Sequence, residues 1–79
     1  MESTEIYSRL TSVFHEVFDD DEIVARPELT AVDVEEWDSL KHIRLIISVE
    51  KAFQIRFAAS EISNLKNVGE LANLIQSKI

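Results

Sequence analysis

The stretch Trp37-Asp38-Ser39-Leu40 ends an acidic segment and opens an apolar one that reaches Phe53. Asp and Ser are favoured at helix N-termini, because their side-chain oxygens accept hydrogen bonds from the free N–H groups of the first turn. We therefore predict a helix that begins at about Ser39. The positive end of the helix dipole lies at the same place, so a phosphate ester on Ser39 would be stabilised there. The simpler interpretation is that Asp38 or Ser39 only caps the helix.

The helix that starts at Ser39 is predicted to run to about Phe53. Its apolar residues fall on nearly every side of a helical wheel, and a helix that is apolar all round is usually buried. We therefore expect it to be the most buried element, through Leu40, Ile43, Leu45, Ile46, Ile47, Val49 and Phe53.

Two further helical segments are predicted downstream. A short connection around Ile55 and Phe57 is expected to turn toward the core, and residues 60–63 predict one brief helical turn. A last helix follows Asn67, because this residue and the acid three positions later form a reciprocal capping pair. Its expected buried residues are Val68, Leu71, Ala72, Leu74 and Ile75.

Upstream, a first helix is predicted to begin at Ser3 or Thr4. Its apolar residues recur at the three- and four-residue spacing of one helix face: Ile6, Leu10, Val13, Phe14, Val17 and Phe18. The acidic run 19–22 ends it, because like charges crowd there and Asp is a poor helix former. Residues 19–38 form a long connection, which we expect to pack down through Ile23, Val24, Leu29, Val32 and Val34.

The predicted fold class is therefore all-α. The expected architecture is a small four-helix bundle, with three long helices and one short one and a long loop between the first two, in a single domain over residues 1–79. The space between the second and last helices should be lined by Leu45, Val49, Phe53, Ile62, Leu65, Leu71 and Ile75.

The composition excludes several functional classes. The net charge of −7 argues against nucleic-acid binding, which needs clustered Lys and Arg. The chain has no cysteine, so it has neither a disulfide nor a thiol of its own. No N-terminal apolar run resembles a signal peptide, and no stretch is long enough to span a membrane. We expect a cytoplasmic monomer with no membrane insertion.

The charge is unevenly distributed. Residues 1–38 carry a net charge of −10, with twelve acids against Arg9 and Arg26, whereas residues 39–79 carry +3. Such asymmetry predicts a polarised surface, although folding can interleave the two halves.

In several segments the chain resembles an acyl carrier protein, and the resemblance covers essentially its whole length. The matching segments are Asp38-Ser39-Leu40, Val49-Glu50-Lys51-Ala52-Phe53, Ile55-Arg56-Phe57, Glu61-Ile62 and Asn67-Val68-Gly69-Glu70-Leu71. A three-residue motif is weak alone. Its position in an acidic chain with this helix order makes the resemblance specific.

The resemblance implies that Ser39 is the covalent attachment site of a phosphopantetheine arm, which supplies the thiol that thioester chemistry needs. The chain would then be a carrier in fatty acid, polyketide or related biosynthesis, and not an enzyme. No general base is evident beside Ser39, so the implied partner is a phosphopantetheinyl transferase that uses coenzyme A. For Asp38 the resemblance implies a helper role, in positioning the hydroxyl or Mg²⁺ of that complex. The other implied partners are acyl-loading and acyl-transferring enzymes.

Some residues depart from the pattern of fatty-acid-synthesis carriers. Those carriers typically have acids along the helix after the serine, where this chain has Lys41, Arg44 and Lys51. Like charges reject wrong partners, so these bases predict a stand-alone carrier of a specialised pathway. The expected docking residues are Asp38, Leu40, Lys41 and Arg44.

The remaining polar motifs have simpler interpretations. The acidic run 19–22 lacks the spacing of a calcium loop, and His15 and His42 have no second ligand at metal spacing, so no metal site is expected. We expect His42 on the surface, where it could contact the arm or a partner, and Trp37 partly buried against the core. The competing functional class is a non-carrier acidic interaction module in which Ser39 is only a helix cap.

Overall fold

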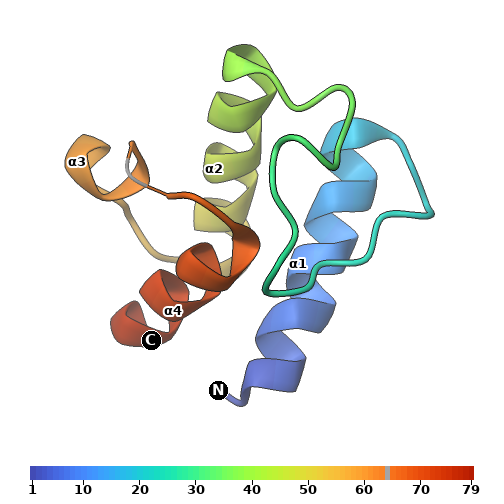
Figure 1. Cartoon of the computed structure of the whole chain (residues 1–79). Helices are drawn as coiled ribbons and strands as arrows, with labels where there is room; N and C mark the ends of the chain where they lie inside the picture. Colours follow the sequence, from blue (N-terminus) through green and yellow to red (C-terminus); the bar gives the residue numbers. More distant parts are fainter. Residues whose placement is uncertain (64) are drawn as a thin grey trace.

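The computed structural model describes residues 1–63 and 65–79, and over these residues the fold is all-α, as predicted. Its four helices are α1 (Ser3–Phe18), α2 (Ser39–Phe53), α3 (Ala59–Ile62) and α4 (Val68–Lys78), shown in Figure 1. Three helices are long, one is a single short turn, and a 20-residue connection, residues 19–38, separates α1 from α2. The predicted helix order is confirmed.

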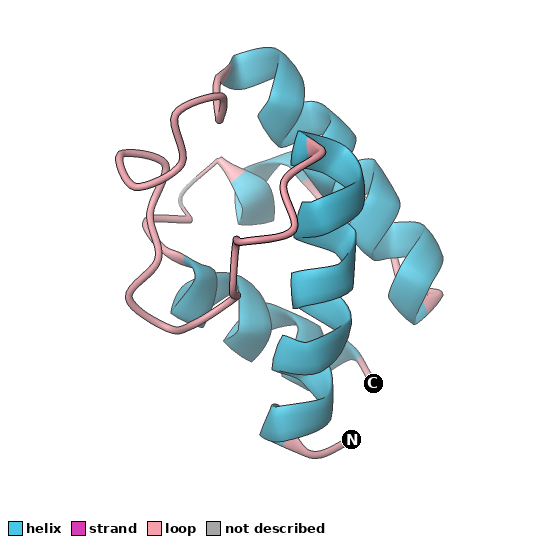
Figure 2. Cartoon of the chain, turned by 90° about the vertical axis from the view of Figure 1, so that its right-hand side faces the viewer, coloured by secondary structure: helices cyan, strands magenta, loops and turns pink. Residues whose placement is uncertain are grey.

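The helix arrangement puts α1 at the centre of the packing. α1 and α2 lie side by side and run in opposite directions, and α2 separates α1 from the short α3 (Figure 1). The most extensive helix–helix contacts are those of α1 with α2 and with α4. Both termini lie near the same lower end of the molecule (Figures 1 and 2).

One buried cluster forms the core, and every buried residue of the described chain is apolar. Five of the seven residues predicted between the second and last helices are buried, whereas Ile62 and Leu65 are only partly buried against this cluster. α1 contributes the largest share of the core, because it faces two helices at once. Its buried residues are Ile6, Leu10, Val13, Phe14 and Phe18.

The prediction that α2 is buried nearly all round is wrong. Leu40, Ile43 and Ile47 are 61%, 54% and 46% exposed. A small bundle can cover only one face of a helix, and the covered face of α2 is formed by Leu45, Ile46, Val49 and Phe53. The predicted burial of Val17 and Leu74 is likewise only partial.

The connection of residues 19–38 packs onto the helices, but not through all the predicted anchors. Leu29 and Val34 are buried as expected, whereas Val24 and Val32 are 59% and 93% exposed. The small Ala25 is buried instead, because its backbone N–H donates a hydrogen bond of 2.9 Å to Thr11 Oγ1 on α1. Polar anchoring of the backbone thus decides which side chains of this segment face inward.

Backbone contacts join the same connection to the start of α4. The Val68 N–H donates to the Leu29 carbonyl at 2.9 Å, and the Gly69 N–H donates to the Pro27 carbonyl at 3.0 Å. A Cβ on Gly69 would meet that Pro27 oxygen at 3.0 Å, so glycine permits the close approach. The connection is therefore fixed to α1 and to α4.

The caps at the helix ends agree only in part with the prediction. Asn67 caps α4 by accepting from the Glu70 N–H at 2.9 Å, but the reciprocal bond is absent, because the Glu70 carboxylate accepts from the Lys66 N–H instead. α1 and α2 both end on a residue other than glycine in the left-handed region, Asp19 at φ 51° and Gln54 at φ 56°.

Candidate functional site

Ser39 is the first residue of α2, and its side chain is exposed. The cap belongs to Asp38: its Oδ1 accepts from the Lys41 N–H at 2.9 Å, and its backbone carbonyl accepts from the His42 N–H at 2.8 Å. Because the first turn of a helix has four N–H groups without helical partners, those of Ser39 and Leu40 remain available to an anion. The site offers an accessible hydroxyl beside free backbone donors.

Trp37 and His42 form a pair next to this helix start. The Trp37 Nε1–H donates to His42 Nδ1 at 3.2 Å, and the two rings stack with centroids 6.1 Å apart. The indole also packs on Phe14, edge-on with ring centroids 5.4 Å apart, and on Phe18, with centroids 5.9 Å apart. Such packing is expected for a tryptophan against the core. His42 is half-buried and hydrogen-bonded, so only part of its side chain lies at the predicted surface position.

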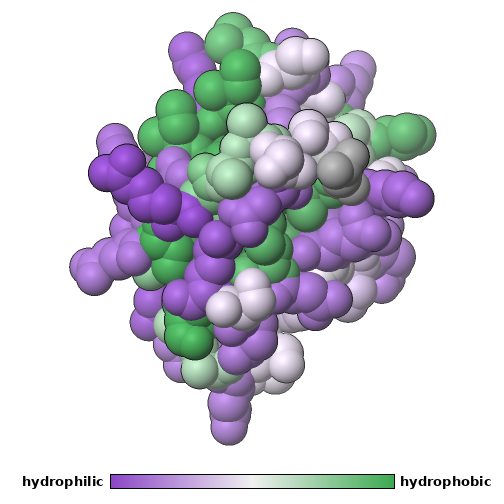
Figure 3. Space-filling view, turned by 90° about the vertical axis from the view of Figure 1, so that its left-hand side faces the viewer, coloured by the Kyte–Doolittle hydropathy of each residue, from purple (hydrophilic) through white to green (hydrophobic). Residues whose placement is uncertain are grey.

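Two neighbouring cavities lie near the start of α2, and Ser39 lines one of them. An open groove of about 570 Å³, called the outer groove here, is lined by Ala31, Trp37, Asp38, Ser39, His42, Ile43, Ala59, Ile62 and Ser63. A more enclosed space of about 70 Å³, the inner cavity, is lined by Ala31, Trp37, His42, Leu65, Lys66, Asn67 and Leu71. Figure 3 views the left-hand side of the molecule in Figure 1. It shows hydrophobic surface in the upper part of that side, at the height where α2 begins. The groove combines mostly apolar walls with the Ser39 hydroxyl.

One wall of the outer groove is α3, which a carboxylate fixes in place. Glu61 Oε1 accepts from the Ala58 N–H at 2.7 Å and pairs with Lys78 Nζ of α4 at 3.1 Å. The hydrogen bond from Ala58, followed by the contact with Lys78, lowers the pKa of Glu61. The ionised carboxylate therefore links the groove wall to the last helix.

The predicted docking residues differ in their surroundings. Leu40 and Arg44 are exposed on α2, whereas Lys41 is half-buried and its Nζ donates to the Val17 carbonyl at 3.2 Å. Val17 lies in the last turn of α1, so the ammonium satisfies one of the free carbonyls at that helix end. Docking through any of these residues stays a prediction.

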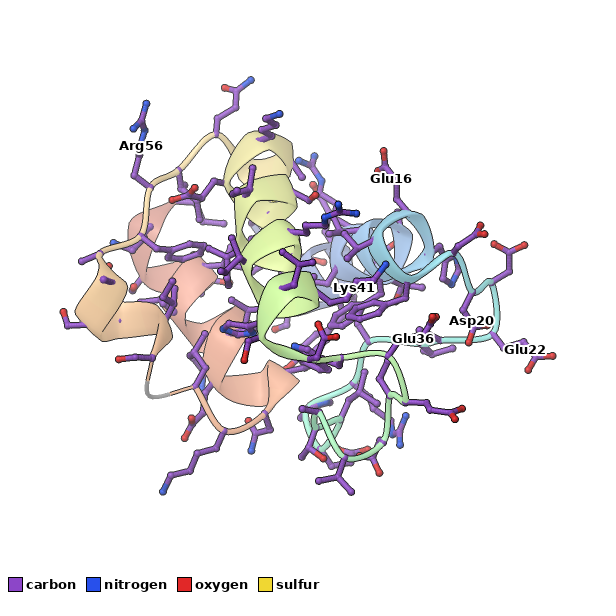
Figure 4. All side chains as sticks on the ribbon, turned by 90° about the horizontal axis from the view of Figure 1, so that it is seen from above. Glu16, Asp20, Glu22, Glu36, Lys41 and Arg56 are labelled. Atoms are coloured by element: carbon purple, nitrogen blue, oxygen red, sulfur yellow. The ribbon has the colours of Figure 1, made fainter. Side chains whose placement is uncertain are left out.

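The acids gather on one side of the site. Figure 4 shows Glu16, Asp20, Glu22 and Glu36 around the end of α1 and the connection after it, with Arg56 at the far side of the molecule. These four acids therefore lie on the same side of the molecule as Lys41. Within residues 1–63 and 65–79, no three His, Cys, Asp or Glu side chains are grouped to hold a metal.

Sequence reasoning missed the residues that connect the site to the core. The Trp37–His42 bond spans five positions across a helix start, a spacing that no helical or strand periodicity marks. His15 is also structural, since its Nε2–H donates to the Ile23 carbonyl at 2.7 Å. The sequence offers only a weak signal for these two contacts: it has one Trp, and its two His lie on either side of residues 19–38.

Comparison with known proteins places these features in a family context. A family model described as a phosphopantetheine attachment site matches residues 8–75. The chain is 30% identical over 71 residues to an acyl carrier protein of Acidothermus cellulolyticus, across 90% of this chain and 84% of the relative. A holo acyl carrier protein from Geobacter metallireducens, solved in solution by NMR, is 48% identical with a TM-score of 0.87, covering 92% of this chain and 84% of that one. No helix in the described part of the chain is both long and apolar enough to cross a membrane.

Proposed function

Because the chain belongs to the acyl carrier protein family, whose members are non-catalytic carriers with a phosphopantetheine arm, we propose that Ser39 bears this arm. The observation that carries the proposal is the exposed Ser39 hydroxyl at the capped start of α2, within the segment that matches the family model. When bound, the arm supplies the thiol that this cysteine-free chain lacks. The cargo is then an acyl group held as a thioester.

The attachment reaction needs an external base. The Ser39 oxygen attacks a phosphorus of coenzyme A, a phosphodiester forms, and the adenosine bisphosphate portion leaves while the hydroxyl proton goes to the base. His42, three residues away, has its Nδ1 lone pair engaged by Trp37. The base therefore belongs to a phosphopantetheinyl transferase, and Asp38, already oriented by its bond to the Lys41 N–H, is placed to help position the hydroxyl or Mg²⁺. We expect this reaction in the cytoplasm.

We further propose that the exposed face of α2 meets the acyl-loading and acyl-transferring enzymes of a specialised lipid, polyketide or related pathway. Leu40, Ile43 and Ile47 give this face an apolar surface, and Arg44 and Lys51 add positive charge to it. Neither cation belongs to the ion pairs of the described residues. A partner surface with apolar and acidic groups complements such a face.

The attachment proposal is tested by incubating the purified apo protein with coenzyme A and a broad-specificity phosphopantetheinyl transferase. Intact mass spectrometry should show one added arm, and peptide mapping should locate it on Ser39. Ser39→Ala should remain folded and unmodified, because Asp38 rather than Ser39 caps α2. Ser12→Ala, a change at an exposed serine of α1, should be modified like wild type. A wild-type protein that gains no mass would favour the non-carrier interaction module, and an arm on Ser39→Ala would disprove the assignment.

A further inference from the structure

Trp37 and His42 lie between the outer groove and the inner cavity. Among the residues that the structure describes, three line both spaces: Ala31, Trp37 and His42. Ser39 lines only the outer groove, and the buried Leu71 lines only the inner cavity. A group that enters from Ser39 therefore meets the indole and the imidazole before it can reach Leu71.

Several contacts hold this pair in place. The indole packs on Phe14 and Phe18 of α1, and its N–H is satisfied by His42 Nδ1. Because Nδ1 accepts this bond, the neutral imidazole carries its proton on Nε2. Separating the rings would leave a half-buried indole N–H without its partner and would remove the ring stacking. The closed arrangement is thus the favoured one.

We propose that the Trp37–His42 pair is the partition that limits how far the cargo of this carrier extends into the molecule, an inference that rests on attachment at Ser39. With the rings together, an acyl chain on the arm lies in the outer groove and does not continue into the inner cavity. The pair is a specificity-determining element, and it favours an acyl group short enough to share the outer groove with the arm.

The walls of the groove suit this type of cargo. Ile43 of α2 and Ile62 of α3 line it on two elements, and Ala31 and Ala59 keep it open because their side chains are small. Burial of each methylene group against such walls stabilises the complex. The stabilisation increases only while each added methylene group still contacts the groove wall. The thermal stability of the loaded protein should therefore rise with acyl length and then reach a plateau.

The test loads the full chain with acetyl, butyryl, hexanoyl, octanoyl, decanoyl and dodecanoyl groups, using the transferase and the matching acyl-coenzyme A compounds. The melting temperature of each form is measured beside the apo protein. In wild type the increase should stop within the series, and the amide NMR signals of Leu65 and Leu71 should stay unchanged at the longest lengths. In His42→Ala the increase should continue to longer acyl groups, and the signals of both leucines should shift.

Two further variants separate the partition from other effects. His42→Asn keeps an acceptor near the position of Nδ1 but removes the ring, so it should behave like His42→Ala if ring bulk closes the passage. Ile43→Ala is the matched control, because Ile43 lines only the outer groove. It should lower the stabilisation by every acyl group without moving the length at which the plateau begins.

The outcomes also distinguish this inference from the attachment proposal. Failure of wild type to gain mass would overturn attachment at Ser39. Hydrogen exchange of the Trp37 indole N–H in the apo protein then still tests the closed pair, because loss of one hydrogen bond in His42→Ala should speed exchange about tenfold. Equal exchange in the two apo proteins, or the same length dependence in loaded wild type and His42→Ala, would overturn the partition.

Discussion

At the scale of single residues, Lys41 has a contact within the fold besides its predicted docking role. Lys41 follows the attachment motif and carries a positive charge, so its sequence context suggests a partner contact. In the folded chain its ammonium also donates a hydrogen bond to the Val17 carbonyl, at the negative end of the α1 dipole. The contact joins the end of α1 to the beginning of α2 across 24 residues of sequence. One cation therefore ties together the two helices that flank the long connection.

Lys41→Met tests this role. Methionine keeps the length and apolar character of the side chain but removes the charged donor, so the free energy of unfolding should fall by about 1 kcal/mol, a value reduced by partial exposure. Urea denaturation measures the change. Arg44→Met, an exposed cation on the same helix, is the control and should alter stability much less. Equal losses in both variants would show that the Val17 contact contributes nothing.

At the scale of elements, the sequence predicts features that depend on neighbouring residues. It does not predict which side chains are buried where that depends on contacts between distant segments. The start of α2 is predictable, because Asp38 caps it through bonds within one turn. The exposure of Ile43 and Ile47 is not, because it depends on which face α1 covers. Inward placement of Ala25 rather than Val24 likewise follows from Thr11, 14 residues away. Attachment at Ser39 stays a prediction that rests on the family resemblance, whereas the Trp37–His42 pair could not be predicted from the sequence.

The contact between Glu61 of α3 and Lys78 of α4 makes the stability of the fold depend on pH. The pKa of Glu61 is lowered in the folded state by the Ala58 N–H and by Lys78, so the carboxylate stabilises the fold above its unfolded pKa. This contribution is lost as the pH falls through the lowered, folded-state pKa. Melting temperatures measured from neutral pH down to acid should therefore drop more steeply in wild type than in Glu61→Gln. Identical slopes would contradict the assigned link, and Glu2→Gln, an exposed acid, serves as control.

At the scale of the whole molecule, several acids gather on one side of the fold. Acids surround the end of α1 and the connection that follows it, while Arg56 lies on the opposite side (Figure 4). The start of α2 with Ser39 borders the acidic side, and Arg44 and Lys51 add cations along the helix. A partner that approaches Ser39 therefore meets both signs of charge. Such patterning controls association rates more than stability.

Charge reversal tests the preference for a specialised partner. We expect wild type, loaded with a malonyl group, to be a poor substrate of a fatty-acid condensing enzyme, and Arg44→Glu with Lys51→Glu to be a better one at low salt. Added salt should reduce the difference, because exposed charges are screened. Arg56→Glu changes an exposed charge that lies beyond the end of α2 and not on this helix, and it should behave as wild type. Wild type working as well as the double variant would remove the support for a specialised pathway.

The single tryptophan of the chain lies at the boundary between solvent, core and groove. Indole emission depends on the polarity of its surroundings, and Trp37 has a histidine on one side and phenylalanine rings on the other. Any group that fills the groove replaces water beside this ring. The protein thus contains its own fluorescent reporter, and loading, unloading and transfer of cargo can be followed in real time without an added dye.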